Sequence, residues 1–378
     1  MKRHLLVLDP TAYRGGSKIA TENILRLLNT DETAITVLTS DMQSWSWPPI
    51  RKIRMRQPDL LANAETGIRY FLRHAIVLLN LLLARLLHGR IDAVLGASGP
   101  GVDLALYMGR PFFGYRLIQL VHGPVAKSRT IARCLARADE VHYLASSEES
   151  ILSSLATIVI EPTGLDTMPG FYLMENGLSE HAWPTRSRTT RPVLFWSASL
   201  LKWKGLDTLL EALAGIPVEM RPETHLCYIR PRNTRLPVTD APVPVERVSW
   251  HEDPEALDTI RASASLFVST SRGEPFGLSI LEALAAGHCV LIPADGAYWD
   301  GVLEDGINCI KYAPADANDL ARKILNIAGD MKLAARIGEN AAKLALGYRA
   351  GLKYAVIRQS LQTGLSVSAR DQHLGEHV

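Results

Sequence analysis

The chain has 378 residues, of which 47% are hydrophobic and 21% charged, and its formal net charge is +2. This is longer than one ordinary domain, and the composition excludes a disordered chain, a coiled coil and a collagen-like repeat. The small net charge suggests no nucleic-acid partner, but residues 1–137 hold 19 Lys and Arg against 9 Asp and Glu, whereas residues 138–378 hold 22 against 30, which indicates an interacting surface.

The first half of the chain alternates short apolar runs with helical stretches. A glycine loop over residues 13–17 precedes a helix expected at Ile19–Leu28, and Ser17 is expected to cap that helix. This alternation predicts a mostly parallel sheet covered by helices. The expected strands are Leu5–Leu8, Ala34–Leu38, Ile91–Gly96, Leu117–Val121, Glu140–Leu144 and Thr157–Ile160.

The same rhythm restarts after a polar segment at 186–192. The expected strands are Val193–Ser197, His225–Ile229, Leu266–Thr270 and Cys289–Pro293. The expected helices are Leu206–Ala214, Leu257–Ala262, Leu278–Ala286, Asp316–Asn326 and Met331–Leu346. Residues 231–244 hold four prolines and predict a surface loop. The fold class is therefore α/β, with two Rossmann-like, doubly wound parallel-sheet domains facing a cleft, where ligands lie at the carboxyl ends of the strands.

The cysteines and the apolar segments indicate the compartment. The four cysteines form no C-x-x-C pair, which favours free thiols in a reducing compartment; they are Cys134, Cys227, Cys289 and Cys309. The N-terminal apolar run is too short for a signal peptide, and the longest apolar stretch, Ala75–Leu87, is shorter than the roughly 20 residues of a membrane span. We therefore expect a cytoplasmic protein without a transmembrane helix.

The most informative segment is residues 271–287, where seven residues separate Glu274 from Glu282. The first backbone N–H groups of the helix, at Phe276, Gly277 and Leu278, form an anion site suited to a diphosphate. Glu282 lies roughly 7.5 Å further along the helix, at 1.5 Å per residue. Two carboxylates on either side of a bound diphosphate fit a sugar on one side and a ribose on the other, as in a nucleotide-sugar.

The run EPFGLSILEALAAG resembles the retaining glycosyltransferases of family 4, glycosyl transferases group 1, which have the GT-B fold. The resemblance implies that Glu274 contacts the donor sugar and Glu282 the ribose. Residues 199–205 resemble the family's R-L-x-x-x-K-G segment, whose lysine, here Lys204, binds the donor phosphate and stabilises developing charge. Ser199 stands where the family has arginine, and Lys202 is a candidate to compensate.

Three shorter segments of the first half extend the resemblance. Gly15-Gly16 resembles a loop whose amides approach the donor phosphate or the acceptor, so Gly16 is a candidate donor-binding residue. His122 follows a strand and corresponds to a family histidine that faces the donor sugar, which makes it a catalytic candidate beside Glu274. Asn176-Gly177 resembles a structural turn. Residues 295–300 depart from the family's Gly-Gly-x-Pro-Glu loop.

The strand pattern and the family resemblance together divide the chain into four parts. Residues 1–185 are expected to form the acceptor domain and 186–345 the nucleotide-sugar donor domain. By the resemblance, a helix at 346–362 crosses back to the first domain, and residues 363–378 are expected to be a disordered tail. No Asp-x-Asp motif occurs, so we expect no metal and no other cofactor, with Lys204 and the helix start in the metal's place.

A basic segment at 51–90 carries eight Lys and Arg, and within it the Ile68–Leu87 stretch is apolar on nearly every face. Such a helix is either buried against the sheet or lies in a membrane interface. The sequence leaves both open. The basic residues suit anionic headgroups or a lipid diphosphate, which suggests peripheral attachment to the inner face of the cytoplasmic membrane.

The sequence thus predicts an enzyme, a retaining hexosyltransferase. It would move a sugar from a UDP- or GDP-linked donor to a glycan or a polyprenyl-diphosphate-linked acceptor, in bacterial exopolysaccharide or surface-polysaccharide synthesis. The alternative is a non-catalytic partner that binds a nucleotide-sugar within a polysaccharide assembly complex, which the serine at 199 keeps open.

Overall fold

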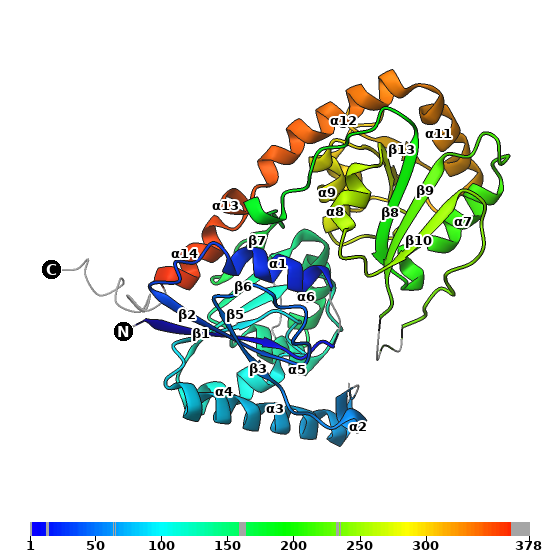
Figure 1. The fold of residues 1–378 in the computed structure, drawn as a ribbon. Coiled ribbons are helices and arrows are strands. Elements are labelled where there is room, and N and C mark those ends of the chain that lie inside the picture. Colours follow the sequence, from blue (N-terminus) through cyan, green and yellow to red (C-terminus); the bar gives the residue numbers. More distant parts are fainter. Residues whose placement is uncertain are drawn as a thin grey trace.

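The structure is a computed structural model with two lobes, each built on one parallel β-sheet (Figure 1). It describes residues 2–12, 15–62, 64, 66–158, 164–231, 234 and 236–363. Within these residues the first lobe holds a seven-stranded sheet and the second a six-stranded sheet. Every pairing within both sheets is parallel, which confirms the predicted α/β class.

The first sheet has the order β3-β2-β1-β4-β5-β6-β7. Its strand order reverses beside β1, which creates a crevice at the carboxyl ends of β1 and β4. The strands are β1 (Arg3–Asp9), β2 (Thr33–Thr39), β3 (Ile50–Arg54), β4 (Ala93–Gly96), β5 (Arg116–Val121), β6 (Glu140–Leu144) and β7 (Phe171–Met174). The helices are α1 (Gly16–Leu25), α2 (Asp59–Ala62), α3 (Gly67–His88), α4 (Leu104–Phe113), α5 (Arg129–Leu135) and α6 (Glu148–Leu155).

The second sheet has the order β10-β9-β8-β11-β12-β13 and reverses between β8 and β11. The segments that follow these two strands carry Lys204 and Glu274. The strands are β8 (Val193–Ser199), β9 (Glu223–Ile229), β10 (Val248–Glu252), β11 (Leu266–Val268), β12 (Cys289–Pro293) and β13 (Ile310–Tyr312). The helices are α7 (Leu206–Ala214), α8 (Leu257–Ala262), α9 (Leu278–Ala286), α10 (Tyr298–Val302), α11 (Ala317–Gly329) and α12 (Met331–Ala345).

Two local predictions for the first lobe were wrong. Thr157 and Ile158 lie in a turn that ends α6, and the last two residues of that expected strand lie outside the described residues. Ser17 does not cap α1, because the helix begins one residue earlier, with Gly15 at the N-cap position. The helix α3 begins at Gly67, well before the apolar run, and its 22 residues reach the length and apolar composition of a membrane span; the absence of a transmembrane helix stays a prediction.

The chain returns to the first lobe after α12. The amide of Leu178 donates to the Tyr348 carbonyl oxygen over 2.9 Å, and the Ala350 amide donates to the Leu178 carbonyl oxygen over 2.8 Å. A Cβ at Gly177 would lie 2.9 Å from the Ala350 Cα, so the Asn-Gly turn permits this close approach. The helices α13 (Ala350–Lys353) and α14 (Ala355–Thr363) then run along the first lobe (Figure 1).

The two lobes share one hydrophobic cluster. It includes Ile24 and Leu178 of the first lobe, Leu281 and Ala345 of the second, and Ile357 of the returning α14. Because all five side chains are buried, their packing removes apolar surface from water at the boundary. The cluster therefore joins the two lobes and the returning α14 in one apolar core. Residues 364–378, most of the expected tail, lie outside the described residues.

Candidate active site

The Lys204 ammonium and the Glu274 carboxylate form an ion pair, with Nζ and Oε2 2.5 Å apart. Both side chains are mostly shielded, at 17% and 12% exposure. The Lys204 ammonium also lies 4.0 Å from the centroid of the Trp203 ring. The two predicted residues, 70 positions apart in sequence, therefore meet at the carboxyl ends of β8 and β11.

A chain of hydrogen bonds fixes the backbone at Lys204. The Trp196 indole nitrogen of β8 donates to the Thr270 hydroxyl over 3.0 Å. That hydroxyl in turn donates to the carbonyl oxygen of Lys204 over 2.8 Å. Thr270 thus links the segment after β8 to the segment after β11. These hydrogen bonds fix the position of the Lys204 backbone at the carboxyl edge of the sheet.

The next residue, Gly205, allows the two segments to approach. Its φ is +70°, and a Cβ there would lie 2.0 Å from the Thr270 carbonyl oxygen. No side chain fits such a space without moving the backbone, and the left-handed conformation adds its own strain.

We expect Gly205→Ala to lower the melting temperature and to weaken donor binding, because the lysine must shift with its neighbour. The matched control is Gly273→Ala, whose φ is +59° but whose Cβ would meet nothing within 4 Å. The control carries only the left-handed strain, about 1–2 kcal/mol. Equal melting temperatures of the two variants in differential scanning calorimetry would contradict the role of the close contact.

The start of α9 is held by the loop that departs from the expected family motif. Gly277 occupies the N-cap position with φ +78°, and its carbonyl oxygen accepts a 3.3 Å hydrogen bond from the Trp299 indole nitrogen. The Asp295 carboxylate accepts from the Gly273 amide over 2.8 Å. Phe276 is buried, with its ring centroid 4.7 Å from that of Tyr298. The first N–H groups of α9 have no intrahelical acceptor and are available to an anion.

Glu282 has a different environment from Glu274. Its carboxylate pairs with the guanidinium of Arg261 in α8, with Oε2 and Nη2 2.9 Å apart. Arg261 also pairs with Asp258, and that carboxylate accepts a 2.6 Å hydrogen bond from the Thr185 hydroxyl. The structure therefore brings Glu274 to Lys204 but engages Glu282 with α8, and its ribose contact remains a prediction.

The first lobe meets this region at two glycines. A Cβ at Gly16 would lie 3.8 Å from Leu278 Cδ1, and one at Gly123 would lie 3.8 Å from Pro275 Cγ. The glycine loop after β1 and the segment after β5 therefore both contact the loop that begins α9. The structure brings together residues that were predicted from separate segments. Gly16 meets Leu278, and Gly123, next to His122, meets Pro275, next to Glu274.

His122 lies beside that contact with both ring nitrogens shielded from solvent. Neither nitrogen has a hydrogen-bond partner among the described residues. Burial lowers the pKa of His122 to about 4, so the ring is neutral at pH 7. A neutral imidazole offers one N–H donor and one acceptor nitrogen to a ligand.

The sequence reasoning missed a buried lysine beneath the glycine loop. The Lys18 ammonium lies 3.0 Å from an Asp9 oxygen and 3.1 Å from an Asp41 oxygen, and it donates to the Thr11 carbonyl oxygen over 2.8 Å. Burial raises the pKa of Asp9, while Lys18 opposes that shift. Asp9 ends β1 and Lys18 lies in the first turn of α1, so the pair fixes the loop between them. The sequence signal was an acidic residue at a strand end with a lysine closely following the glycine pair.

A second missed cluster joins the lobes behind α9. The Tyr298 hydroxyl contacts the Glu175 carboxylate and lies 2.8 Å from the Tyr348 hydroxyl. Lys353 pairs with the same carboxylate. Burial, followed by the hydrogen bond to Glu175, raises the pKa of Tyr298 above its usual value. The loop at 295–300 thus connects α9 to the first lobe, and its departure from the family motif was the available signal.

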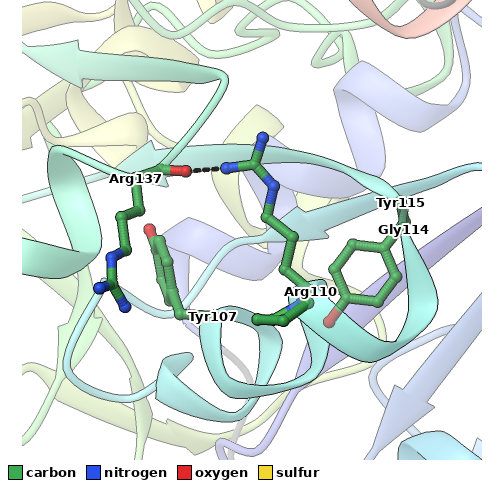
Figure 2. Close-up of a pocket in the computed structure, with 6 residues that line it drawn as sticks. Tyr107, Arg110, Gly114, Tyr115 and Arg137 are labelled. Carbon is green, nitrogen blue, oxygen red and sulfur yellow. Dashed lines mark hydrogen bonds between the residues drawn. The ribbon is translucent and has the colours of Figure 1, made fainter.

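A small cavity lies at the candidate site, and a larger pocket lies away from it. A cavity of about 10 Å³, room for roughly one water molecule, is lined by Glu274, Ile280 and Trp299 among others. A larger pocket of about 530 Å³ lies between Arg110 and Arg137 (Figure 2). It opens near the amino ends of β5 and β6, at the opposite edge of the sheet from His122, so it is separate from the candidate site.

Within the part of the chain that the structure describes, no three or more His, Cys, Asp or Glu side chains gather as a metal-binding group. The prediction of metal independence therefore still requires a functional measurement.

Residues 179–344 match the family model described as "Glycosyl transferases group 1". The matched region includes both the Lys204 segment and the Glu274–Glu282 segment. No curated protein matches the chain.

Solved structures of similar shape cover nearly the whole chain. Anabaena Alr3699/HepE, in complex with UDP and glucose, has a TM-score of 0.70 and 16% identity, and the match covers 95% of this chain and 99% of that one. Sucrose-phosphate synthase from Thermosynechococcus elongatus has a TM-score of 0.71 and 17% identity over 96% and 98%. WaaG, a glycosyltransferase involved in lipopolysaccharide biosynthesis, has a TM-score of 0.62 and 16% identity over 95% and 100%. These likenesses confirm the GT-B fold.

Proposed function

We propose that this chain is a retaining glycosyltransferase of family 4 that transfers a hexose from a nucleotide-sugar to a glycan or a lipid-linked oligosaccharide. The observation that carries the proposal is the Lys204–Glu274 pair beside the start of α9, opposite His122 of the other lobe. It lies within the region that matches the group 1 glycosyl transferase model. UDP-sugars are the first donors to test, because HepE was crystallised with UDP and with UDP-glucose.

In this proposal each side chain has one role. The α9 amides and the Lys204 ammonium bind the diphosphate and stabilise the charge that develops on it as the sugar leaves. Glu274 and the neutral His122 hold hydroxyl groups of the donor sugar, and Glu282 accepts from the ribose hydroxyls. The cavity beside Glu274 is lined by second-lobe residues and holds about one water molecule. We propose that donor binding includes closure of the lobes over the site.

The test is a panel of UDP-, GDP- and ADP-sugars with lipid-linked and soluble glycan acceptors, read by mass spectrometry. Proton NMR of the product distinguishes retention from inversion of the anomeric configuration. Transfer from one donor with the anomeric configuration retained supports the proposal, and an inverted product rejects the assignment to a retaining family.

We also propose that transfer needs no divalent metal, because Lys204 and the α9 amides supply positive charge at the diphosphate. The expected result is an unchanged initial rate after treatment with EDTA and desalting. Added Mg²⁺ or Mn²⁺ should not raise that rate. If EDTA abolishes the rate and Mn²⁺ restores it, Lys204 and the α9 amides do not suffice to bind the diphosphate, and the enzyme needs a metal ion.

The first lobe supports a proposal for the acceptor and the location. We propose a polyprenyl-diphosphate-linked acceptor in bacterial surface-polysaccharide synthesis, at the inner face of the cytoplasmic membrane. Support comes from the basic segment 51–90, and the similar WaaG takes part in lipopolysaccharide biosynthesis.

One observation favours a second candidate, a non-catalytic nucleotide-sugar-binding partner. Ser199 replaces the expected arginine, and the residue proposed to compensate, Lys202, pairs with Asp207 of α7 at 3.5 Å. Binding of a donor by calorimetry, with no transfer to any acceptor in the panel, would favour this alternative.

A further inference from the structure

The helix α3 exposes an apolar face. Seven of its apolar side chains are more than half exposed: Ile68, Phe71, Leu72, Leu79, Leu83, Leu86 and Leu87. At about 100° per residue, Ile68, Leu72, Leu79, Leu83 and Leu86 fall within about 60° of one another, so they form one continuous stripe. Exposure of these five side chains is unfavourable, because it leaves their apolar surface in contact with water.

The opposite face of α3, against the lobe, is mixed. It buries Val77, Leu81 and Ala84 together with three polar residues, Arg73, His74 and Asn80. The Asn80 side chain accepts from the Arg56 amide and donates to the Arg56 carbonyl oxygen, each over 2.9 Å. The Arg73 guanidinium donates to the Ala64 carbonyl oxygen over 3.3 Å. A helix on the surface of a water-soluble lobe has polar residues outward, whereas α3 is apolar on its outer face as well.

The exposed stripe continues onto neighbouring elements. Leu60 of α2 is exposed, and so is Phe112 at the end of α4. The Arg85 guanidinium donates to the Phe113 carbonyl oxygen over 3.2 Å, which ties α3 to α4. Figure 1 shows α2, α3 and α4 along one side of the first lobe, on the side away from α14. An apolar surface of this extent indicates an interaction site.

Basic side chains flank the stripe. On β3 the exposed residues are Arg51, Lys52 and Arg54, and Arg51 contacts the His88 ring at the end of α3 over 3.2 Å. Arg69 is exposed in the first turn of α3, and Arg90 follows its end. An apolar strip flanked by cations matches an anionic membrane surface, where apolar side chains enter the acyl boundary and cations meet the headgroups.

We propose that α3 lies in the plane of an anionic bilayer and inserts its leucine stripe, with the β3 cations on the headgroups. The helix does not span the bilayer, since extraction would break the Asn80 and Arg73 hydrogen bonds that attach it to the lobe. A second copy of the chain is disfavoured, because a two-fold axis on the stripe would bring the Arg51 and Arg69 regions of both copies together.

The proposal rests on the proposed membrane location and deepens it by naming the element that enters the bilayer, and it gives the acceptor an approach. The Tyr70 hydroxyl, in the first turn of α3, donates to the Gly101 carbonyl oxygen over 2.7 Å. Gly101 follows the carboxyl end of β4, at the sheet edge that also carries Gly16 and His122. The bilayer would therefore meet the lobe on the side where a lipid-linked acceptor must enter, if that acceptor is the substrate.

The test is co-sedimentation of the full chain with vesicles of phosphatidylcholine containing phosphatidylglycerol, and with phosphatidylcholine alone. We expect binding to the anionic vesicles that high salt weakens, and a loss of about tenfold or more in the double variant Leu83→Glu/Leu86→Glu. The control is Met220→Glu/Ile307→Glu on the second lobe, where both residues are more than half exposed, as Leu83 and Leu86 are. The control should bind as the unaltered chain does.

A second measurement reports which face is inserted. The four native cysteines are buried, so an environment-sensitive fluorophore is placed on Leu86→Cys or, as control, on Ile307→Cys. Blue-shifted emission with vesicles at position 86 alone supports the proposal. It is overturned if no vesicles bind, if both positions respond alike, or if sedimentation velocity shows a lipid-free dimer that Leu83→Glu/Leu86→Glu dissociates. Because neither measurement uses a donor, their failure is distinguishable from failure of the proposed enzyme activity.

Discussion

Replacing Glu274 by glutamine is expected to lower kcat for sugar transfer by about 10²–10³, while donor affinity stays the same or rises. Glutamine keeps the shape of the side chain but removes the charge that now pairs with Lys204 at 2.5 Å. The freed ammonium then meets the diphosphate without competition. The loss of the carboxylate acts on the sugar, where charge develops in the transition state.

The measurement is a kcat series with calorimetric donor binding on the same preparations. Glu339→Gln is the matched control, because Glu339 also forms a 2.5 Å ion pair, with Arg186, on the second lobe, and is exposed there. It should change neither quantity. A Glu274 variant that loses donor affinity while kcat stays unchanged would place this carboxylate in ground-state binding only.

Replacing Lys204 by methionine is expected to produce the largest loss of donor binding, by about tenfold or more, since a charge-assisted contact to a phosphate is lost. The change also leaves the Glu274 carboxylate unpaired in a position that is only 12% exposed. An uncompensated, shielded charge costs stability, so the melting temperature should fall as well.

Two variants separate these effects. Lys202→Met removes a neighbouring lysine that is 57% exposed and paired with Asp207, and it should leave donor binding unchanged. The double variant Lys204→Met/Glu274→Gln should recover the melting temperature without recovering donor binding, because it removes the unpaired charge but not the need for a cation. If binding recovers with stability, Lys204 acts through folding rather than through the phosphate.

In the second lobe the edge strands β10 and β13 were not expected, but the inner elements were predicted well because their local signals agree with one another. The helices Leu206–Ala214, Leu257–Ala262 and Leu278–Ala286 and the strand Cys289–Pro293 have the predicted bounds. The buried strands are continuous apolar runs, and α9 ends at Gly287 in a left-handed conformation. In such segments the local pattern and the tertiary environment require the same residues.

The first lobe was predicted less well where strands lie at the sheet edges. The strand β3 has one buried residue, Ile50, and three exposed basic ones, so its sequence resembles a solvated loop. The strand β7 is short and also half exposed. Their strand conformation depends on pairing with β2 and β6, and that pairing is a long-range property of the sheet.

By itself the sequence determined the two α/β units, and it predicted the α9 start, Lys204 and Glu274 as parts of one donor site. Only the tertiary structure decided that these two charges pair, that Glu282 is held by Arg261, and that loop 295–300 holds Gly277. It also decided that α3 directs its leucines outward. The physical reason is the same throughout: a helix that is apolar on nearly every side does not specify its buried face, and a charge does not specify its partner. Both depend on which segments the sheet order brings together.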